Sequence, residues 1–99
     1  MPLFVRLVKI TSEGMKHVKE LPERYARGRD YLESLGGKVV DAYAVSGPYD
    51  LIAIFEAPDE QVVMKHRLFV AQTGYVEILT MPATKIEEFL KTVAEVPAE

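Results

Sequence analysis

The sequence contains no cysteine among its 99 residues. The absence of thiols excludes disulfide bonds, thiolate nucleophiles, and zinc or iron–sulfur sites built on cysteine. There are only two histidines, His17 and His66, and no phosphate-binding loop, nucleophile elbow or His–Glu metal motif. We therefore expect no metal site and no bound cofactor.

Long apolar runs and clustered basic residues are also missing. No apolar stretch approaches the roughly 18 residues of a membrane span. The segment Met1–Ile10 has no basic region, uninterrupted apolar core or cleavage site of a signal peptide. Lysine and arginine are scattered, and the formal net charge is −3, which argues against nucleic acid as a partner. These features predict a cytoplasmic protein that binds neither a membrane nor nucleic acid.

The length and the apolar content set the scale of the fold. A chain of 99 residues suits one domain, which we place at residues 1–99. Hydrophobic residues make up 48% of the sequence, and a core of this size is modest. Part of the apolar surface is therefore expected to be buried between subunits.

Periodicity predicts an alternating order of strands and helices. Strands are expected at residues 3–10, 38–45, 51–57 and 75–81. A short helix is expected to about Lys19, a longer one from Pro22 to the Gly36-Gly37 stop, and another at 58–73. A capping-box pattern at Thr84 predicts a last helix. This order is βαββαβ with an extra C-terminal helix, an α+β fold of the ferredoxin-like type.

The strands are apolar on both faces, although two helices cover only one face of a sheet. In the first strand Leu3, Val5 and Leu7 alternate with the equally apolar set that surrounds Arg6. The simplest cover for the second face is another copy of the same sheet. The sequence thus predicts a homodimer, or a higher homo-oligomer, packed sheet to sheet.

A turn between the second and third predicted strands carries a family signature. The segment Gly47-Pro48-Tyr49-Asp50-Leu51-Ile52, followed by Glu56-Ala57-Pro58-Asp59, resembles the GYD-domain family of small prokaryotic proteins. Further landmarks of the likeness are Thr11, Leu35-Gly36-Gly37-Lys38, and Gly74 with Val76. The resemblance implies a ferredoxin-like fold of the dimeric α/β-barrel group. It implies no activity.

The signature turn supplies the first two candidate site residues. Tyr49 and Asp50 offer a phenol and a carboxylate that would orient a ligand at a strand edge. In the competing interpretation, which we favour, Asp50 bonds to backbone amides of its own turn and Tyr49 packs over the hairpin end.

Three further candidates come from polar groups within apolar segments: Arg6, Tyr43 and His66. Strands one and four are neighbours in this fold, so Arg6 and Glu77 are expected to face each other across the sheet. That pair would be an interface ion pair or part of the polar lining for an anionic or aromatic ligand. His66 lies in an apolar helix stripe. A histidine in such a place is more often a hydrogen-bonded structural residue, and the functional alternative is a general base.

The residues and the resemblance are compatible with three functions. The first, which we favour, is a dimeric protein that binds a small ligand or acts as an accessory or regulatory protein without catalysis. The second is a small cofactor-free enzyme of oxygenase, isomerase or dehydratase type. It predicts a pocket of a few hundred Å3 that holds a histidine or carboxylate with a shifted pKa. The third is a purely structural oligomer.

Overall fold

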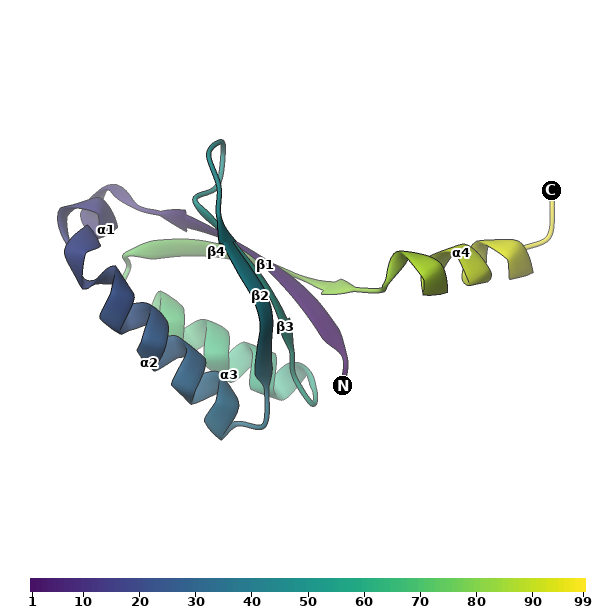
Figure 1. Cartoon of the computed structure of the whole chain (residues 1–99), viewed down its shortest axis with the longest axis horizontal. Helices are drawn as coiled ribbons and strands as arrows, with labels where there is room; N and C mark the ends of the chain where they lie inside the picture. Colours follow the sequence, from purple (N-terminus) through teal and green to yellow (C-terminus); the bar gives the residue numbers. More distant parts are fainter.

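The computed structural model describes residues 1–99 and shows a four-stranded antiparallel sheet with two long helices on one face (Figure 1). The strands are in the order β2-β3-β1-β4, which is the ferredoxin-like arrangement that the sequence predicts. The elements are β1 (Leu3–Ile10), α1 (Ser12–Lys16), a 3-10 turn (Val18–Glu20), α2 (Leu21–Ser34), β2 (Lys38–Ala44), β3 (Leu51–Glu56), α3 (Glu60–Ala71), β4 (Val76–Ala83) and α4 (Ile86–Glu95).

Local sequence explains where the helices begin and end. The Thr11 side chain caps α1 by accepting a hydrogen bond from the Gly14 amide, and Asp59 caps α3 through the Val62 amide. Pro22 lies in the first turn of α2, where its missing N–H costs nothing. Helix α2 ends where Gly36 adopts a φ of 89°, a left-handed conformation that suits glycine.

The end of β4 and the start of α4 differ from the prediction. Strand β4 runs to Ala83 because β1 pairs with it along its whole length, from Ile10 opposite Val76 to Leu3 opposite Ala83. Pro82 is tolerated because β4 is an edge strand. Thr84 consequently falls in the short link after the strand. The predicted capping box is wrong: α4 begins after Lys85 without a side-chain cap.

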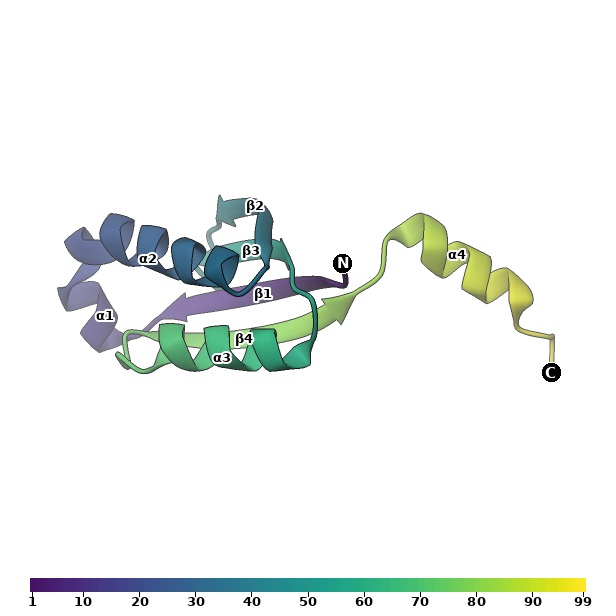
Figure 2. The same cartoon turned by 90° about the horizontal axis from the view of Figure 1, so that it is seen from below.

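The apolar core occupies one half of the space between sheet and helices. It consists of Phe4, Leu32, Phe55 and Ala57, with the Phe4 and Phe55 rings stacked at 5.5 Å. The core lies beside the first half of β1. The second half of β1 faces the cavity described below. Figure 2 shows α2 and α3 side by side over the same face of the sheet.

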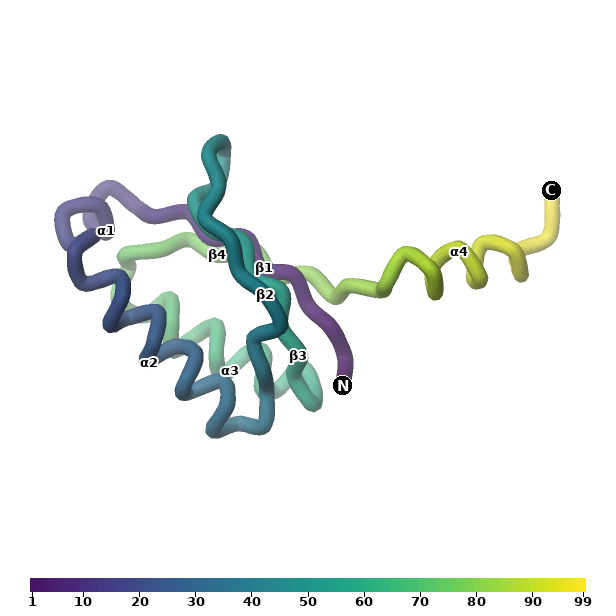
Figure 3. The backbone as a smooth tube through the Cα atoms, viewed as in Figure 1, coloured from purple at the N-terminus to yellow at the C-terminus, as the bar shows by residue number.

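The opposite face of the sheet has no covering element. In register it carries Val5 beside Met81 and Leu7 beside Leu79, and the latter side chain is 46% exposed. Helix α4 also stands apart from the rest of the chain (Figure 3), and its Ile86, Phe89, Leu90 and Val93 are all exposed. None of the helices has the length and apolar character to cross a membrane.

Candidate ligand-binding site

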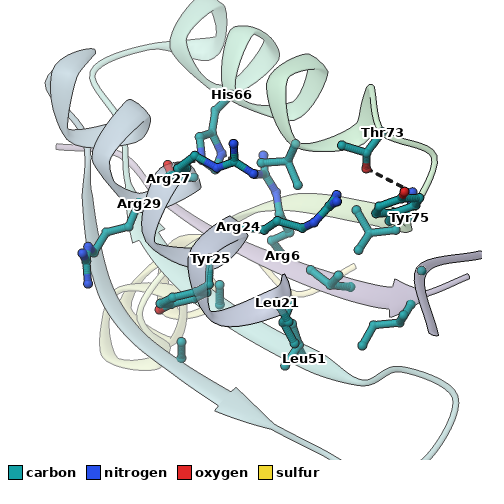
Figure 4. A pocket seen from close by; sticks show the side chains of 18 of the residues that line it. Arg6, Leu21, Arg24, Tyr25, Arg27, Arg29, Leu51, His66, Thr73 and Tyr75 are labelled. Carbon is teal, nitrogen blue, oxygen red and sulfur yellow. Dashed lines mark hydrogen bonds between the residues drawn. The ribbon is translucent and has the colours of Figure 1, made fainter. Parts of the chain in front are cut away.

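A cavity of about 540 Å3 lies between the sheet and helices α1, α2 and α3 (Figure 4). Its lining is mostly hydrophobic, and it includes four arginines but no aspartate or glutamate. This is unusual for a chain with a net charge of −3. The arginines are Arg6, Arg24, Arg27 and Arg29.

Arg6 is the central polar group of the cavity. It projects from β1 toward the helices and is only 3% exposed. Its Nε donates to the Thr80 Oγ1 at 2.9 Å, and its Nη1 donates to the Nδ1 of His66 at 2.5 Å. The guanidinium also lies 4.8 Å from the Phe55 ring centroid. The remaining nitrogen, Nη2, is buried and has no hydrogen-bond partner.

His66 holds Arg6 from the side of α3. The backbone oxygen of Gly28 lies 2.9 Å from the Nε2 of His66, so this nitrogen is the protonated donor and Nδ1 is the acceptor from Arg6. Burial, and then the charge of Arg6, lower the pKa of His66 to about 4. His66 is therefore neutral at physiological pH, and both ring nitrogens are already engaged.

The positive charge of Arg6 has no acidic partner in the structure. Burial, and then repulsion from Arg67, lower the pKa of Arg6 to about 10, so it remains a cation at neutral pH. Both of its acceptors, Thr80 and His66, are neutral. A buried charge without a counter-charge is costly, by several kcal/mol as an order of magnitude. The cavity therefore has a strong electrostatic preference for an anion.

A second cationic group at the α1 end of the cavity is neutralised within the chain. Arg24 donates from Nη2 to Glu20 at 2.8 Å, and its guanidinium lies 4.0 Å from the Tyr75 ring centroid. His17 stacks on Tyr75 and donates from Nδ1 to the other oxygen of Glu20. Hydrogen bonds from Arg24 and His17 lower the pKa of Glu20, and Glu20 raises the pKa of Arg24.

The five candidates from the sequence fall into two groups. Arg6, His66 and Tyr43 border the cavity, with Tyr43 on the edge strand β2, where its hydroxyl donates to Asp41. Tyr49 and Asp50 lie in the β2–β3 connection and do not line the cavity. No three or more histidine, aspartate or glutamate side chains converge to hold a metal ion.

The Asp50 side chain bonds to the end of β1 and not, as predicted, to amides of its own turn, so it ties the hairpin to that strand. Its Oδ2 accepts a hydrogen bond from the Ile10 amide at 2.8 Å, and its own amide donates to the Val8 oxygen. We expect Asp50→Ala to lower the free energy of unfolding by about 1–2 kcal/mol, because the Ile10 amide loses its acceptor. Urea denaturation measures this. Loss of ligand binding without a loss of stability would instead place Asp50 in the binding site.

The expected pair of Arg6 and Glu77 does not form. Arg6 lies opposite Thr80 and points toward the helices, whereas Glu77 lies opposite Lys9 on the uncovered face. In this register the side chains of Arg6 and Glu77 point to opposite faces of the sheet, so no change of rotamer brings them together. Arg6 is thereby left without a carboxylate.

Thr80, Arg24 and Tyr75 are site residues that the sequence did not single out. Thr80 follows from the strand register, since it is directly opposite Arg6. Arg24 precedes Gly28 by one helical repeat of four, and Gly28 provides the carbonyl that holds His66. The sequence feature that could have located this site is the absence of acidic residues from the helix and strand faces that turn toward the cavity.

Comparison with known proteins points to one family and one fold. The family model described as GYD domain matches residues 4–93. A Thermus thermophilus protein named "Glutamine synthetase and cystathionine beta-lyase binding protein" is 34% identical over 91 residues, covering 91% of this chain and 96% of that protein.

Two solved structures are similar to the chain. The crystal structure of MtbAldR superposes with a TM-score of 0.64 at 14% identity, over 84% of this chain. The chain spans about half of MtbAldR, 51% of its length. Because the identity is only 14%, the likeness shows a shared fold. The crystal structure of TTHA0845 from Thermus thermophilus gives a TM-score of 0.43 at 22% identity, over 86% of this chain and 95% of that one.

Proposed function

The chain belongs to the GYD-domain family, and on this premise we propose that it is a homodimeric accessory protein that binds a small molecule without catalysing its conversion. The single observation that carries the proposal is the guanidinium of Arg6, whose Nη2 is buried and unpaired beside a mostly apolar cavity. A buried cation with an unpaired N–H donor adds no stability to a fold unless another molecule supplies the missing acceptor.

The size of the cavity supports ligand binding. Its volume of about 540 Å3 falls within the range of small-molecule sites, and its few polar groups converge beside an apolar wall. The alternative of a cofactor-free enzyme expects the same volume and a histidine with a shifted pKa, and both are present. Binding is favoured because His66 has no free nitrogen to accept a proton from a substrate.

An accessory role is supported by the relative that is named for binding two enzymes. We extend only the general role to this chain: its output passes through a protein partner. Mixing the protein with purified glutamine synthetase and measuring association by sedimentation tests whether the relative's partner is shared. A stable complex would support this extension, and its absence at micromolar concentrations would remove it.

Ligand binding is tested by a thermal-shift screen of small metabolites on two proteins. Ala53 lies opposite Arg6 in the sheet and lines the cavity, so Ala53→Met fills space beside the guanidinium while the charge stays. We expect compounds that raise the melting temperature of the parent protein and fail to raise that of the variant. If no compound stabilises the parent, or if every hit stabilises both proteins equally, the cavity is not a binding site.

The homodimer is proposed from the uncovered face of the sheet, which presents Val5, Leu7, Leu79 and Met81 together. A second copy of the sheet matches this surface by symmetry. Leu79→Lys is expected to weaken dimerisation at least about tenfold, because a lysine ammonium would be desolvated in the interface. Sedimentation velocity over a dilution series measures the change.

Met64→Lys is the matched control for Leu79→Lys. Met64 is equally apolar and is 60% exposed, but it lies on α3, on the far side of the molecule from the uncovered face. Its substitution should leave the dimer intact. A parent protein that is monomeric at micromolar concentration would contradict the dimer and also the alternative of a purely structural oligomer.

A further inference from the structure

We propose that the ligand of the cavity is an amphipathic monocarboxylate: a single carboxylate head held by Arg6, on an apolar body that fills the space between β1, α2 and α3. This inference rests on the proposed ligand-binding function and names the chemical class of the ligand.

The donor pattern of Arg6 suits a carboxylate. A guanidinium has five N–H groups, and the structure uses one on Nε for Thr80 and one on Nη1 for His66. The free donors are thus the two on Nη2 and one on Nη1. Donors on these two adjacent nitrogens form the planar fork that binds both oxygens of a carboxylate. Thr80 and His66 hold the guanidinium in one orientation, and a carboxylate reaches the buried Nη2 once the side chains over it move aside.

The charge balance indicates a single negative charge. Of the other arginines at the cavity, Arg24 is paired with Glu20, Arg29 lies beside Asp30 and Glu33, and Arg27 is exposed to solvent. His66 is neutral. Arg6 is therefore the one deeply buried cation without an acidic partner, and a monoanion neutralises it. A phosphate dianion would keep an excess negative charge in the same apolar surroundings.

The walls around Arg6 indicate an apolar body for the ligand. Val8 and Ile10 follow Arg6 on the same face of β1, Leu51 extends this wall from β3, and Phe69 and Val70 close it from α3. Inorganic anions would leave these surfaces in contact with trapped water. A carboxylate with an aliphatic or aromatic chain buries them, and each buried methylene adds to the affinity.

The probe for this inference is 4-phenylbutanoate, with 4-phenylbutanol as the uncharged match of nearly the same shape. By isothermal titration calorimetry at pH 7, the carboxylate should bind the parent protein at least about tenfold more tightly than the alcohol, as expected for a hydrogen-bonded ion pair. In Arg6→Met the preference should vanish. Lys91→Met, which removes an exposed cation on α4 outside the cavity, should retain it.

The possible outcomes separate the inference from the function on which it rests. If the alcohol binds as tightly as the carboxylate, the proposed class is wrong while ligand binding stands. If phenyl phosphate binds more tightly than 4-phenylbutanoate, the monoanion is wrong. If a preference for the carboxylate persists in Arg6→Met, Arg6 is not its partner.

The thermal-shift screen gives a further outcome. If it yields hits but none of them is a carboxylate, the proposed ligand class is wrong while ligand binding stands. If Arg6→Met does not fold, the comparison of the two probes on the parent protein still decides.

Discussion

Replacing Gly14 by alanine is expected to lower the free energy of unfolding by about 3 kcal/mol, at the upper end of the cost of overpacking. An added Cβ would lie 2.1 Å from the backbone oxygen of Tyr75 and 2.9 Å from the Ile10 side chain. The Tyr75 oxygen cannot retreat, because it also accepts the hydrogen bond from the Thr11 amide. Helix α1 would have to move off the end of β4, and with it the stacked rings of His17 and Tyr75 at the rim of the cavity.

Gly28→Ala is the matched control for Gly14→Ala. An added Cβ at Gly28 would meet Val70 and His66 at 3.7 and 3.8 Å, which is ordinary van der Waals contact. In the middle of α2 the substitution should stabilise the protein by up to about 1 kcal/mol, because alanine is the better helix former. Urea denaturation of both variants at equal protein concentration measures the contrast. Equal effects, or a stable Gly14→Ala, would contradict the packing of α1 described here.

Lowering the pH from 7 to 4.5 is expected to remove about 2 kcal/mol of unfolding free energy through His66 alone. The pKa of His66 is about 4 in the folded protein and near 6.5 in an unfolded chain. Between these two pH values His66 is protonated in the unfolded state and neutral in the folded state. Stability is therefore full above about pH 6.5 and falls as the pH drops toward 4.

His66→Gln isolates this contribution from that of the carboxylates. Glutamine offers an amide N–H to the Gly28 oxygen but does not titrate in this range. Urea denaturation at pH 7 and pH 4.5 should show a smaller loss of stability in His66→Gln than in the parent, by about 2 kcal/mol. An identical loss in both proteins would mean that His66 is protonated in the folded state, and the acceptor role of Nδ1 toward Arg6 would be wrong.

Most of the fold could be predicted from local patterns. Alternating apolar residues located the four strands, Gly36-Gly37 marked the end of the long helix, and the order of elements gave the ferredoxin-like arrangement. The prediction failed at Thr84, where pairing along the full length of β1 extends β4 to Ala83. A capping pattern is a local signal, and here a non-local strand ladder overrides it.

The candidate site was less predictable because it depends on register and on long-range contacts. Arg6 and His66 were noticed as polar groups in apolar segments, but their contact joins residues 60 positions apart. The partner assigned to Arg6 was wrong, because Glu77 lies on the opposite face of the sheet. Thr80 takes that place. Only the full register shows that the guanidinium is buried without any carboxylate beside it.

The central claim is that the Arg6 guanidinium is the receptor for an anionic ligand. Nuclear magnetic resonance of the arginine side-chain Nε–H groups tests it most directly, with Arg6→Met assigning the Arg6 signal. Titration with 4-phenylbutanoate should shift the Arg6 signal in a saturable manner while the signals of exposed arginines such as Arg67 stay in place. A titration that leaves the Arg6 signal unmoved, or that moves all arginine signals alike, would contradict the account.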